Sequence, residues 1–222
     1  MSAKLIAIEG LDGSGKETQT GLLREALQKK GLNVASVSFP RYGNPSAALV
    51  EDYLHGGFGE HASEVNAYAA SSFFAMDRLV SYLKDWRDVY ETSDVLIADR
   101  YTTSNAIHQC SKLPKQQWKI FVDWLLQYEH ELLGLPKADV VFYLRLDTGT
   151  SQQLLAKRYN GDSTKRDVHE RDLDYLERSR QAAEWCCNYL NWIPIECVRD
   201  SKLRDKSDVH NEIMERLYLW EI

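Results

Sequence analysis

The segment Gly10–Lys16, "GLDGSGK", spaces its glycines as G-x-x-x-x-G and ends in a lysine. Glycines let successive backbone N–H groups turn inward around an anion, and the N-terminus of a following helix adds partial positive charge. A lysine at the end of such a loop reaches the β- and γ-phosphates of a nucleoside triphosphate. The segment therefore predicts an ATP-binding loop formed by Gly10, Leu11, Asp12, Gly13, Ser14, Gly15 and Lys16.

Glu17 occupies the position at which such loops usually carry the serine or threonine that binds Mg²⁺. A carboxylate is also a hard oxygen ligand, so Mg²⁺ binding through Glu17 stays open. Thr18 lies about 100° further round the helix, which is poor geometry for direct ligation. Contact through water from either residue is a third arrangement. The loop is thus a working variant, or one that binds nucleotide without catalysis.

Another polar group follows a strand-like apolar run, "DVLIADRY", which ends in Asp99, Arg100 and Tyr101. In open parallel sheets, ligands bind beyond the carboxyl ends of the strands. Asp99 can organise a metal shell there, and the planar guanidinium of Arg100 can hold a phosphate. An isolated Asp-Arg pair is most often a surface ion pair. One strand end away from a phosphate loop, it indicates a functional site.

Two further motifs carry arginine beside aromatic residues. "FPRYGNP" follows a second strand-like run and supplies Arg41 as another phosphate ligand. "SSFFAMDRL" places Phe74 and Arg78 four residues apart, on one face of a helix. A ring and a guanidinium on one face can stack on a base and bond its edge. The same spacing also suits ordinary core packing.

Short apolar runs alternate with helical patterns along the chain, which indicates an α/β fold. Helical spacing is expected over 18–32, 62–90 and 206–220. Nearly continuous apolar strands separated by helices are typical of a parallel sheet covered on both faces. The five predicted strands are Leu5–Glu9, Asn33–Phe39, Asp94–Arg100, Ala138–Leu146 and Ile193–Val198.

Bulk properties narrow the class of protein. The 222 residues suit one domain, 1–222. A net charge of −6 argues against binding to a nucleic-acid backbone, which needs a basic face. The start of the chain has no signal-peptide layout, and no apolar run approaches the ~18 residues that span a membrane. The four cysteines form no C-x-x-C pair, so we expect reduced, buried thiols in a cytoplasmic protein.

The most polar stretch runs over about 157–172, "KRYNGDSTKRDVHERD". It carries many charges and almost no apolar residues. A solvated loop explains this composition, and so does a mobile lid over a phosphate site.

Taken together, the motifs resemble the thymidylate kinase family of nucleoside monophosphate kinases. Their order, EGLDGSGK, FPR, FFAMDR, DRYTTSNAIHQ, the charged lid and the last strand and helix, covers nearly the whole chain. The resemblance implies a three-layer P-loop kinase fold, with a five-stranded parallel sheet and a lid. It implies transfer of the γ-phosphate of ATP to dTMP, with Mg²⁺, giving dTDP for dTTP synthesis. It also implies a homodimer, in which Trp118, Trp124 and Tyr128 line either the dimer face or the core.

The resemblance assigns a role to each candidate residue. Its implied catalytic group is Lys16, Asp12, Asp99, Arg100 and Arg158, with Glu17 and Asp99 as metal ligands. The implied ATP contacts are the loop residues with Glu17, Thr18 and the lid residues Arg158 and Lys165 or Arg166. The implied acceptor contacts are Asp12 at the sugar, Arg41 and Arg100 at the phosphate, Phe74 and Arg78 at the base, and Ser104, His108 and Gln109.

Two departures from the family pattern bear on these roles. His108 stands where relatives usually carry a phenyl or phenol ring beside the sugar, and imidazole can pack there too. Position 13 is Gly, so the loop lacks a catalytic arginine, for which lid arginines compensate in one branch of the family. Two alternatives stay open: a kinase for another nucleoside monophosphate or a deoxynucleoside, and a nucleotide-binding regulator without catalysis.

Overall fold

The computed structural model describes residues 2–59, 61–158, 162 and 173–218. Its centre is a five-stranded parallel sheet in the order β2-β3-β1-β4-β5. The strands are β1 (Lys4–Gly10), β2 (Val34–Ser38), β3 (Val95–Asp99), β4 (Val140–Arg145) and β5 (Ile193–Glu196). The predicted α/β fold with five parallel strands is confirmed.

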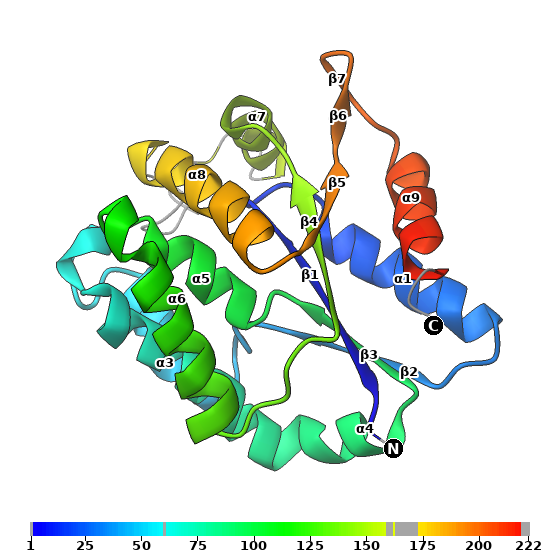
Figure 1. The fold of residues 1–222 in the computed structure, drawn as a ribbon, viewed down its shortest axis with the longest axis horizontal. Helices are drawn as coiled ribbons and strands as arrows, with labels where there is room; N and C mark the ends of the chain where they lie inside the picture. Colours follow the sequence, from blue (N-terminus) through cyan, green and yellow to red (C-terminus); the bar gives the residue numbers. More distant parts are fainter. Residues whose placement is uncertain (1, 60, 159–161, 163–172, 219–222) are drawn as a thin grey trace.

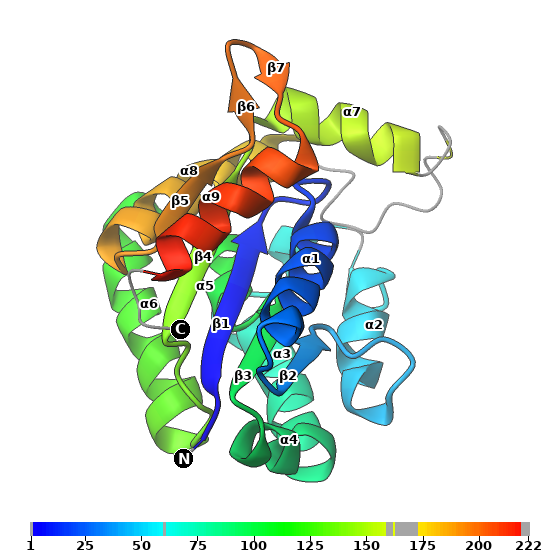
Figure 2. The same ribbon diagram turned by 90° about the vertical axis from the view of Figure 1, so that its right-hand side faces the viewer.

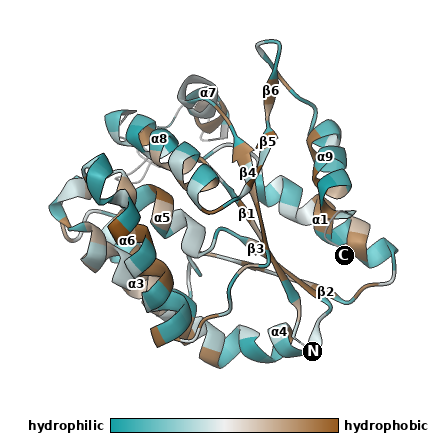
Figure 3. Ribbon diagram, in the orientation of Figure 1, coloured by the Kyte–Doolittle hydropathy of each residue, from teal (hydrophilic) through white to brown (hydrophobic). Residues whose placement is uncertain are grey.

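The strands are apolar along their whole length because both faces of the sheet are covered. In β1, Ile6 and Ile8 join a core cluster on one face, and Leu5 and Ala7 join a second cluster on the other. All four side chains are fully buried. Figure 3 shows hydrophobic strands in the middle of the molecule, with hydrophilic stretches on the outer sides of the helices.

Helices form a layer on each side of the sheet (Figures 1 and 2). One side holds α1 (Lys16–Lys29) and α9 (Lys206–Tyr218). The other side holds α3 (Ala67–Ser81), α5 (Thr102–Cys110), α6 (Trp118–Leu126) and α8 (Leu173–Tyr189). The remaining α-helices are α2 (Ala48–Leu54), α4 (Arg87–Thr92) and α7 (Thr148–Arg158).

Short helical segments extend or connect these elements. Three are 3₁₀ turns: η1 (Pro45–Ala47), η2 (Ala62–Glu64) and η4 (Lys115–Gln117). Two are π-helical: η3 (Tyr82–Trp86), which joins α3 to α4, and η5 (Gln127–Leu132), which continues α6. The expectation of a mainly helical stretch over 62–90 is confirmed, although it consists of several pieces.

The last predicted strand, 193–198, is confirmed for its first four residues, but its last two residues, Cys197 and Val198, do not belong to β5. β5 ends at Glu196, and β6 (Val198–Arg199) pairs antiparallel with β7 (Lys202–Leu203). Asp200 and Ser201, between them, have left-handed φ angles of 51° and 57°. Two such residues form the tight turn that suits the twist of a two-stranded hairpin. The chain therefore leaves the sheet, and the hairpin extends past the end at which the Gly10–Lys16 loop lies (Figure 1).

The sheet order places two of the predicted motifs side by side. β1 and β3 are neighbours, and Ile8 pairs with Asp99. The loop after β1 and the polar residues after β3 therefore emerge next to each other, at the edge where parallel sheets bind ligands.

Within the described part of the chain, no helix has the length and apolar character needed to cross a bilayer. The four cysteines are buried free thiols, as expected.

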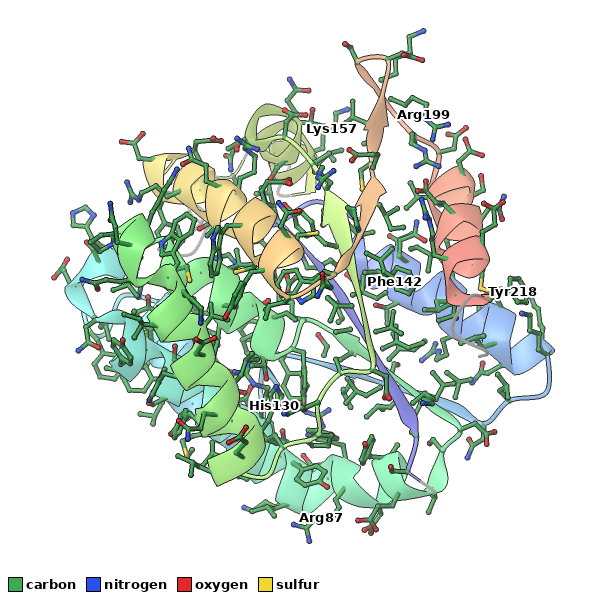
Figure 4. The ribbon with its side chains drawn as sticks, in the orientation of Figure 1. Arg87, His130, Phe142, Lys157, Arg199 and Tyr218 are labelled. Carbon is green, nitrogen blue, oxygen red and sulfur yellow. The ribbon has the colours of Figure 1, made fainter. Side chains whose placement is uncertain are left out.

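We predict that Phe142→Ala lowers the free energy of unfolding by about 3–5 kcal/mol, as truncation of a buried phenyl ring does. Phe142 is fully buried in the cluster that also contains Leu23 and Leu27 of α1 (Figure 4). Urea unfolding at 25 °C measures the change. Leu203→Ala, at a side chain that is 52% exposed, is the control and should cost less than about 0.5 kcal/mol. Equal losses in the two variants would contradict this core assignment.

Candidate active site

The Gly10–Lys16 loop turns sharply between β1 and α1, and its shape requires glycine. A Cβ atom at Gly10 would lie 2.5 Å from Ser14 Oγ and 2.9 Å from the Leu144 carbonyl oxygen. Gly15 precedes the first turn of α1 with a left-handed φ of 90°. The loop therefore brings its backbone N–H groups to a helix N-terminus, as an anion site needs.

The Lys16 ammonium lies folded against the loop. Its Nζ donates to the carbonyl oxygens of Gly10 and Leu11 at 3.0 Å each, and lies 3.8 Å from Asp12 Oδ1. Burial lowers the pKa of Lys16, the charge of Arg100 lowers it further, and Asp12 opposes both. A partly desolvated cation at a phosphate loop gains strongly from an added anion, which is what this loop is predicted to bind.

Arg100 leaves β3 in an unusual backbone conformation, with a left-handed φ of 65°. Its guanidinium forms an ion pair with Asp12 and lies 3.2 Å from Ser104 Oγ and 3.4 Å from Glu9 Oε1. Burial alone lowers the pKa of Arg100, but the carboxylates of Asp12 and Glu9 outweigh it and raise the pKa above its ordinary value. Arg100 is thus a permanent cation directed at the loop by two carboxylates.

Sequence reasoning missed Glu9, the carboxylate that organises this junction. Glu9 is fully buried at the end of β1. It accepts hydrogen bonds from the Gly10 N–H at 2.8 Å, Thr103 Oγ1 at 2.8 Å and Ser104 Oγ at 2.7 Å. It therefore joins the loop to the start of α5. The available signal was one carboxylate in an otherwise apolar strand, directly before the first glycine.

A wide cleft of about 1040 Å³ opens over the loop and the ends of β2 and β3. Such a volume exceeds that of ordinary small-molecule pockets, at roughly 300–1000 Å³, and has room for a nucleotide. Glu17 and Thr18 are exposed on the first turn of α1 and line the cleft. Arg24 and Arg41 line it as well, so its walls carry both cations and anions.

Asp99, the last residue of β3, borders the same cleft. Burial raises the pKa of its carboxyl above the ordinary value, whereas Lys16 and Arg100 act in the opposite direction. The carboxylate of Glu17 is near enough to raise that pKa as well. The charge of Glu17 thus acts on the pKa of Asp99, the other predicted metal ligand.

A narrow pocket, between α3 and α5 and beside the loop, collects most of the residues predicted to bind the acceptor. Phe74 and Arg78 come from α3, and Ser104 and His108 come from α5, each pair at the four-residue spacing of one helix face. The predicted residues that line the pocket are Asp12, Phe74, Arg78, Arg100, Ser104, His108 and Gln109.

Gln109 directs an unsatisfied amide at the narrow pocket. The side chain is fully buried, and within the described ranges neither Nε2 nor Oε1 has a hydrogen-bond partner. A buried amide without partners costs free energy, so a ligand that offers a donor and an acceptor gains from binding beside it. A nucleobase edge offers such a pair.

His108 packs against α8 rather than standing free. It is 7% exposed, and its ring lies parallel to that of Tyr175, with centroids 6.1 Å apart. The Tyr175 hydroxyl donates to the backbone carbonyl of His108 at 2.9 Å. Burial, and then the charge of Arg100, lowers the pKa of His108 to about 3. The ring is therefore neutral near pH 7.

Arg41 lies along the wide cleft and not among the residues of the narrow pocket. Its backbone N–H donates to Asp77 Oδ2 at 2.9 Å, and Ser46 Oγ donates to Asp77 Oδ1 at 2.6 Å. Its guanidinium is 3.4 Å from Asp85 Oδ2. Asp77, from α3, thus fixes the loop after β2 at the cleft edge.

The helix before the predicted lid packs on the phosphate loop. Ser151 Oγ of α7 donates to the Asp12 carbonyl at 2.6 Å, and a Cβ at Gly13 would lie 3.1 Å from the Ser151 carbonyl oxygen. Glycine at position 13 is therefore what permits this close approach. Most of the predicted lid lies outside the described residues, as do the side chains of Arg158, Lys165 and Arg166.

Six further residues line the narrow pocket and were not predicted as site residues, namely Phe39, Pro40, Tyr42, Leu54, Tyr101 and Asn105. Tyr42 directly follows Arg41. Asn105 precedes Gln109 by four residues, so helical spacing alone would have placed it on the same face.

Comparisons with known proteins agree with this geometry. The family model described as thymidylate kinase matches residues 8–213. A thymidylate kinase from Mycobacterium tuberculosis (strain H37Rv) is 36% identical over 181 residues, which cover 79% of this chain and 81% of that protein. A probable thymidylate kinase from Staphylothermus marinus is 27% identical over 214 residues, covering 96% of this chain and 95% of the relative.

A solved structure has the same fold. The thymidylate kinase of Candida albicans superposes with a TM-score of 0.68 at 21% identity, covering 99% of this chain and 93% of the other. The three-layer arrangement around a five-stranded parallel sheet is therefore shared over nearly the whole chain.

We predict that His108 makes unfolding depend on pH. Folded His108 stays neutral down to about pH 3, whereas an unfolded histidine protonates near its ordinary pKa of 6.5. Between pH 3 and pH 6.5, the unfolded state therefore binds more protons than the folded state. The stability that neutral His108 contributes is present above pH 6.5 and is lost as the pH falls below it. From pH 7 to pH 5 the loss is about 2 kcal/mol.

Urea unfolding at both pH values, for wild type and His108→Gln, measures this loss. The variant should lack it, while the control His55→Gln, at an exposed histidine, should retain it. An unchanged difference between pH 7 and pH 5 in His108→Gln would show that His108 does not carry the effect.

Proposed function

The chain belongs to the thymidylate kinase family, and from that premise we propose that it transfers the γ-phosphoryl group of ATP to dTMP, giving ADP and dTDP for dTTP synthesis. One observation carries the proposal. A single pocket is lined by the cation Arg100 with Asp12 of the phosphate loop, and also by the aromatic ring of Phe74 and several polar side chains. That layout fits a phosphorylated pyrimidine nucleoside.

The acceptor would lie with its phosphate toward the loop. Arg100 would bind that phosphate, because its guanidinium is permanently charged and already directed there. Phe74 would stack on the thymine ring, while Arg78, Ser104 and Gln109 face its polar edge. His108 would pack beside the deoxyribose and Asp12 would lie near it. Arg41, at the mouth of the cleft, would reach the acceptor phosphate from the opposite side.

Phosphoryl transfer needs alignment and charge cancellation more than covalent chemistry. The loop N–H groups and Lys16 would hold the ATP phosphates, and Glu17 and Thr18 would border them at the start of α1. The attacking atom is a phosphate oxygen of dTMP, so no general base is required. Arg100 and Lys16 would cancel the charge that gathers between the two anions as they approach.

The donor set suits Mg²⁺, which sites of this type hold through one or two carboxylates together with substrate phosphates. Asp99 and Glu17 both line the cleft and interact across it. When bound there, Mg²⁺ supplies charge cancellation at the phosphate oxygens. Asp99 is the better placed of the two, because the sheet holds it beside the loop.

We further propose one kinase domain over 1–222, with the segment at about 157–172 as a lid that carries Arg158 over ATP. The contact of Ser151 with the loop supports this role, because it couples α7, which leads into the lid, to the phosphate site.

A two-fold dimer through α3 and α6 is proposed from their surface. Tyr68 and Ile120 are 40% and 66% exposed, and Tyr68 packs edge-on against Trp124 at 4.6 Å. Tyr128 stacks on Trp124 at 5.1 Å, whereas Trp118 belongs to the core.

The four buried thiols fit the reducing cytoplasm, which we propose as the location of the protein.

A coupled ADP-release assay with ATP, Mg²⁺ and a panel of nucleoside monophosphates plus thymidine tests the activity. Turnover with dTMP well above the other acceptors is expected. Turnover with thymidine instead would contradict the phosphate role of Arg100. ATP binding without turnover would identify a nucleotide-binding protein that has lost the chemistry.

We predict that Arg100→Ala lowers kcat/KM for dTMP by about 2–4 kcal/mol, the range for a lost charge-assisted contact to phosphate. Steady-state kinetics with varied dTMP measures the change. Arg216→Ala, at a side chain that is 52% exposed on α9, is the matched control and should leave kcat/KM unaltered. A near-normal value for Arg100→Ala would remove Arg100 from the acceptor site.

We predict that Glu17→Ala raises the Mg²⁺ concentration for half-maximal rate by at least about threefold, because one carboxylate is lost from the metal site. Initial rates at varied Mg²⁺ and saturating nucleotides measure the requirement. Glu25→Ala, exposed on α1 and absent from the cleft lining, serves as control. If the Mg²⁺ requirement is the same in Glu17→Ala and wild type, Glu17 takes no part in metal binding.

A further inference from the structure

Glu129 is a buried carboxylate behind the narrow pocket, on the π-helical segment η5. Each of its oxygens accepts two hydrogen bonds. Oε1 accepts from Arg78 Nη2 at 2.6 Å and Asn105 Nδ2 at 3.0 Å. Oε2 accepts from Arg78 Nε at 2.7 Å and Thr102 Oγ1 at 2.8 Å. Glu129 itself does not line the pocket, so it acts only through these neighbours.

Glu129 fixes which end of the Asn105 amide faces the pocket. Asn105 Nδ2 donates to Glu129 Oε1 and to the Ser71 carbonyl oxygen at 3.1 Å. Both partners are acceptors only, so the amide cannot turn over without setting its oxygen against two other oxygens. Asn105 lines the narrow pocket, and its Oδ1 accepts from no residue in the described part of the chain. The pocket wall therefore carries a hydrogen-bond acceptor at this position.

The same carboxylate fixes Arg78 as a donor. Nε and Nη2 are committed to Glu129, and Arg78, which also lines the narrow pocket, keeps Nη1 for a ligand. A guanidinium has no acceptor. A donor and an acceptor, both held by Glu129 Oε1, thus line the pocket that also contains Phe74. Thymine offers the complement, an O4 acceptor beside an N3–H donor, whereas cytosine offers an amino donor beside an N3 acceptor.

We propose that Glu129 is a positioning residue that sets the hydrogen-bond polarity of the narrow pocket, so that it accepts a thymine and rejects a cytosine monophosphate. The inference rests on the proposed function, because it concerns the acceptor of that reaction. A π-helical turn at η5 places the carboxylate between α3 and α5, and such turns occur often at functional sites. Thr102 donates to the second oxygen from α5, so the carboxylate is held by both helices.

Glu129→Gln tests the proposal, with kinetics for dTMP, dCMP and ATP. An amide retains one acceptor oxygen and adds a donor, so Arg78 loses one partner and Asn105 becomes free to turn. KM for dTMP should rise about tenfold or more, while kcat changes less than about threefold and KM for ATP is unaltered. The kcat/KM ratio of dTMP to dCMP should fall about tenfold or more.

The control is Glu131→Gln, an exposed carboxylate on the same segment, which should leave all these values unchanged. A purely structural role for Glu129 would lower kcat for every acceptor in proportion and spare the dTMP to dCMP ratio. That pattern, or an unaltered KM for dTMP in folded Glu129→Gln, would overturn the proposal. Melting curves with and without dTMP establish that the variant is folded.

Wild-type protein keeps the proposal testable if Glu129→Gln does not fold, because removal of one partner from a buried ion pair is strongly destabilising. Calorimetry should detect dTMP binding and a loss of at least about a hundredfold in affinity for dCMP and for dTMP methylated at N3. Equal affinity for the methylated nucleotide would overturn the inference. Wild type that fails to phosphorylate dTMP would instead contradict the proposed function, so the two failures are distinguishable.

Discussion

The site depends on one electrostatic arrangement, the guanidinium of Arg100 held between the carboxylates of Asp12 and Glu9. This contact exists because β1 and β3 are parallel neighbours whose carboxyl ends meet, and because Arg100 turns out of its strand with a left-handed φ. A charged fork held beside a glycine loop lies where we propose that the acceptor phosphate binds, and fixed charges of this kind stabilise the charge of a transition state. The rest of the fold keeps these strand ends together.

A second guanidinium–carboxylate pair, Arg78 with Glu129, stands at the other end of the narrow pocket. The Arg78 pair differs from the Arg100 pair in its exposure to solvent. The Arg100 pair is partly exposed and can exchange a carboxylate for a phosphate, whereas the Arg78 pair is 2% and 0% exposed and has every carboxylate lone pair in use. Buried ion pairs add little net stability, but they fix geometry. This difference supports the proposal that the acceptor phosphate binds beside Arg100 and the neutral base beside Arg78.

The sequence predicted features that are local in the chain. The glycine loop, the strand ends and the i,i+4 pair of Phe74 and Arg78 follow from spacing, and the structure brings them together. Partners that are distant in the chain could not be predicted. Glu129 lies 51 residues from Arg78, and nothing in "QYEHELLG" distinguishes its buried carboxylate from the exposed one of Glu131. The β6–β7 hairpin was missed because neither Asp200 nor Ser201, which adopt left-handed conformations, is the glycine that marks most two-residue hairpin turns.

The central claim is that one cleft aligns two nucleotides, with ATP on the loop and a thymine monophosphate in the narrow pocket. Its most direct test is calorimetry with a single molecule that joins adenosine to thymidine through a chain of five phosphates. We expect one molecule per chain to bind, with an affinity far above that of ATP or dTMP alone, and the gain to vanish when cytidine replaces thymidine. Binding no tighter than ATP alone would contradict a shared cleft.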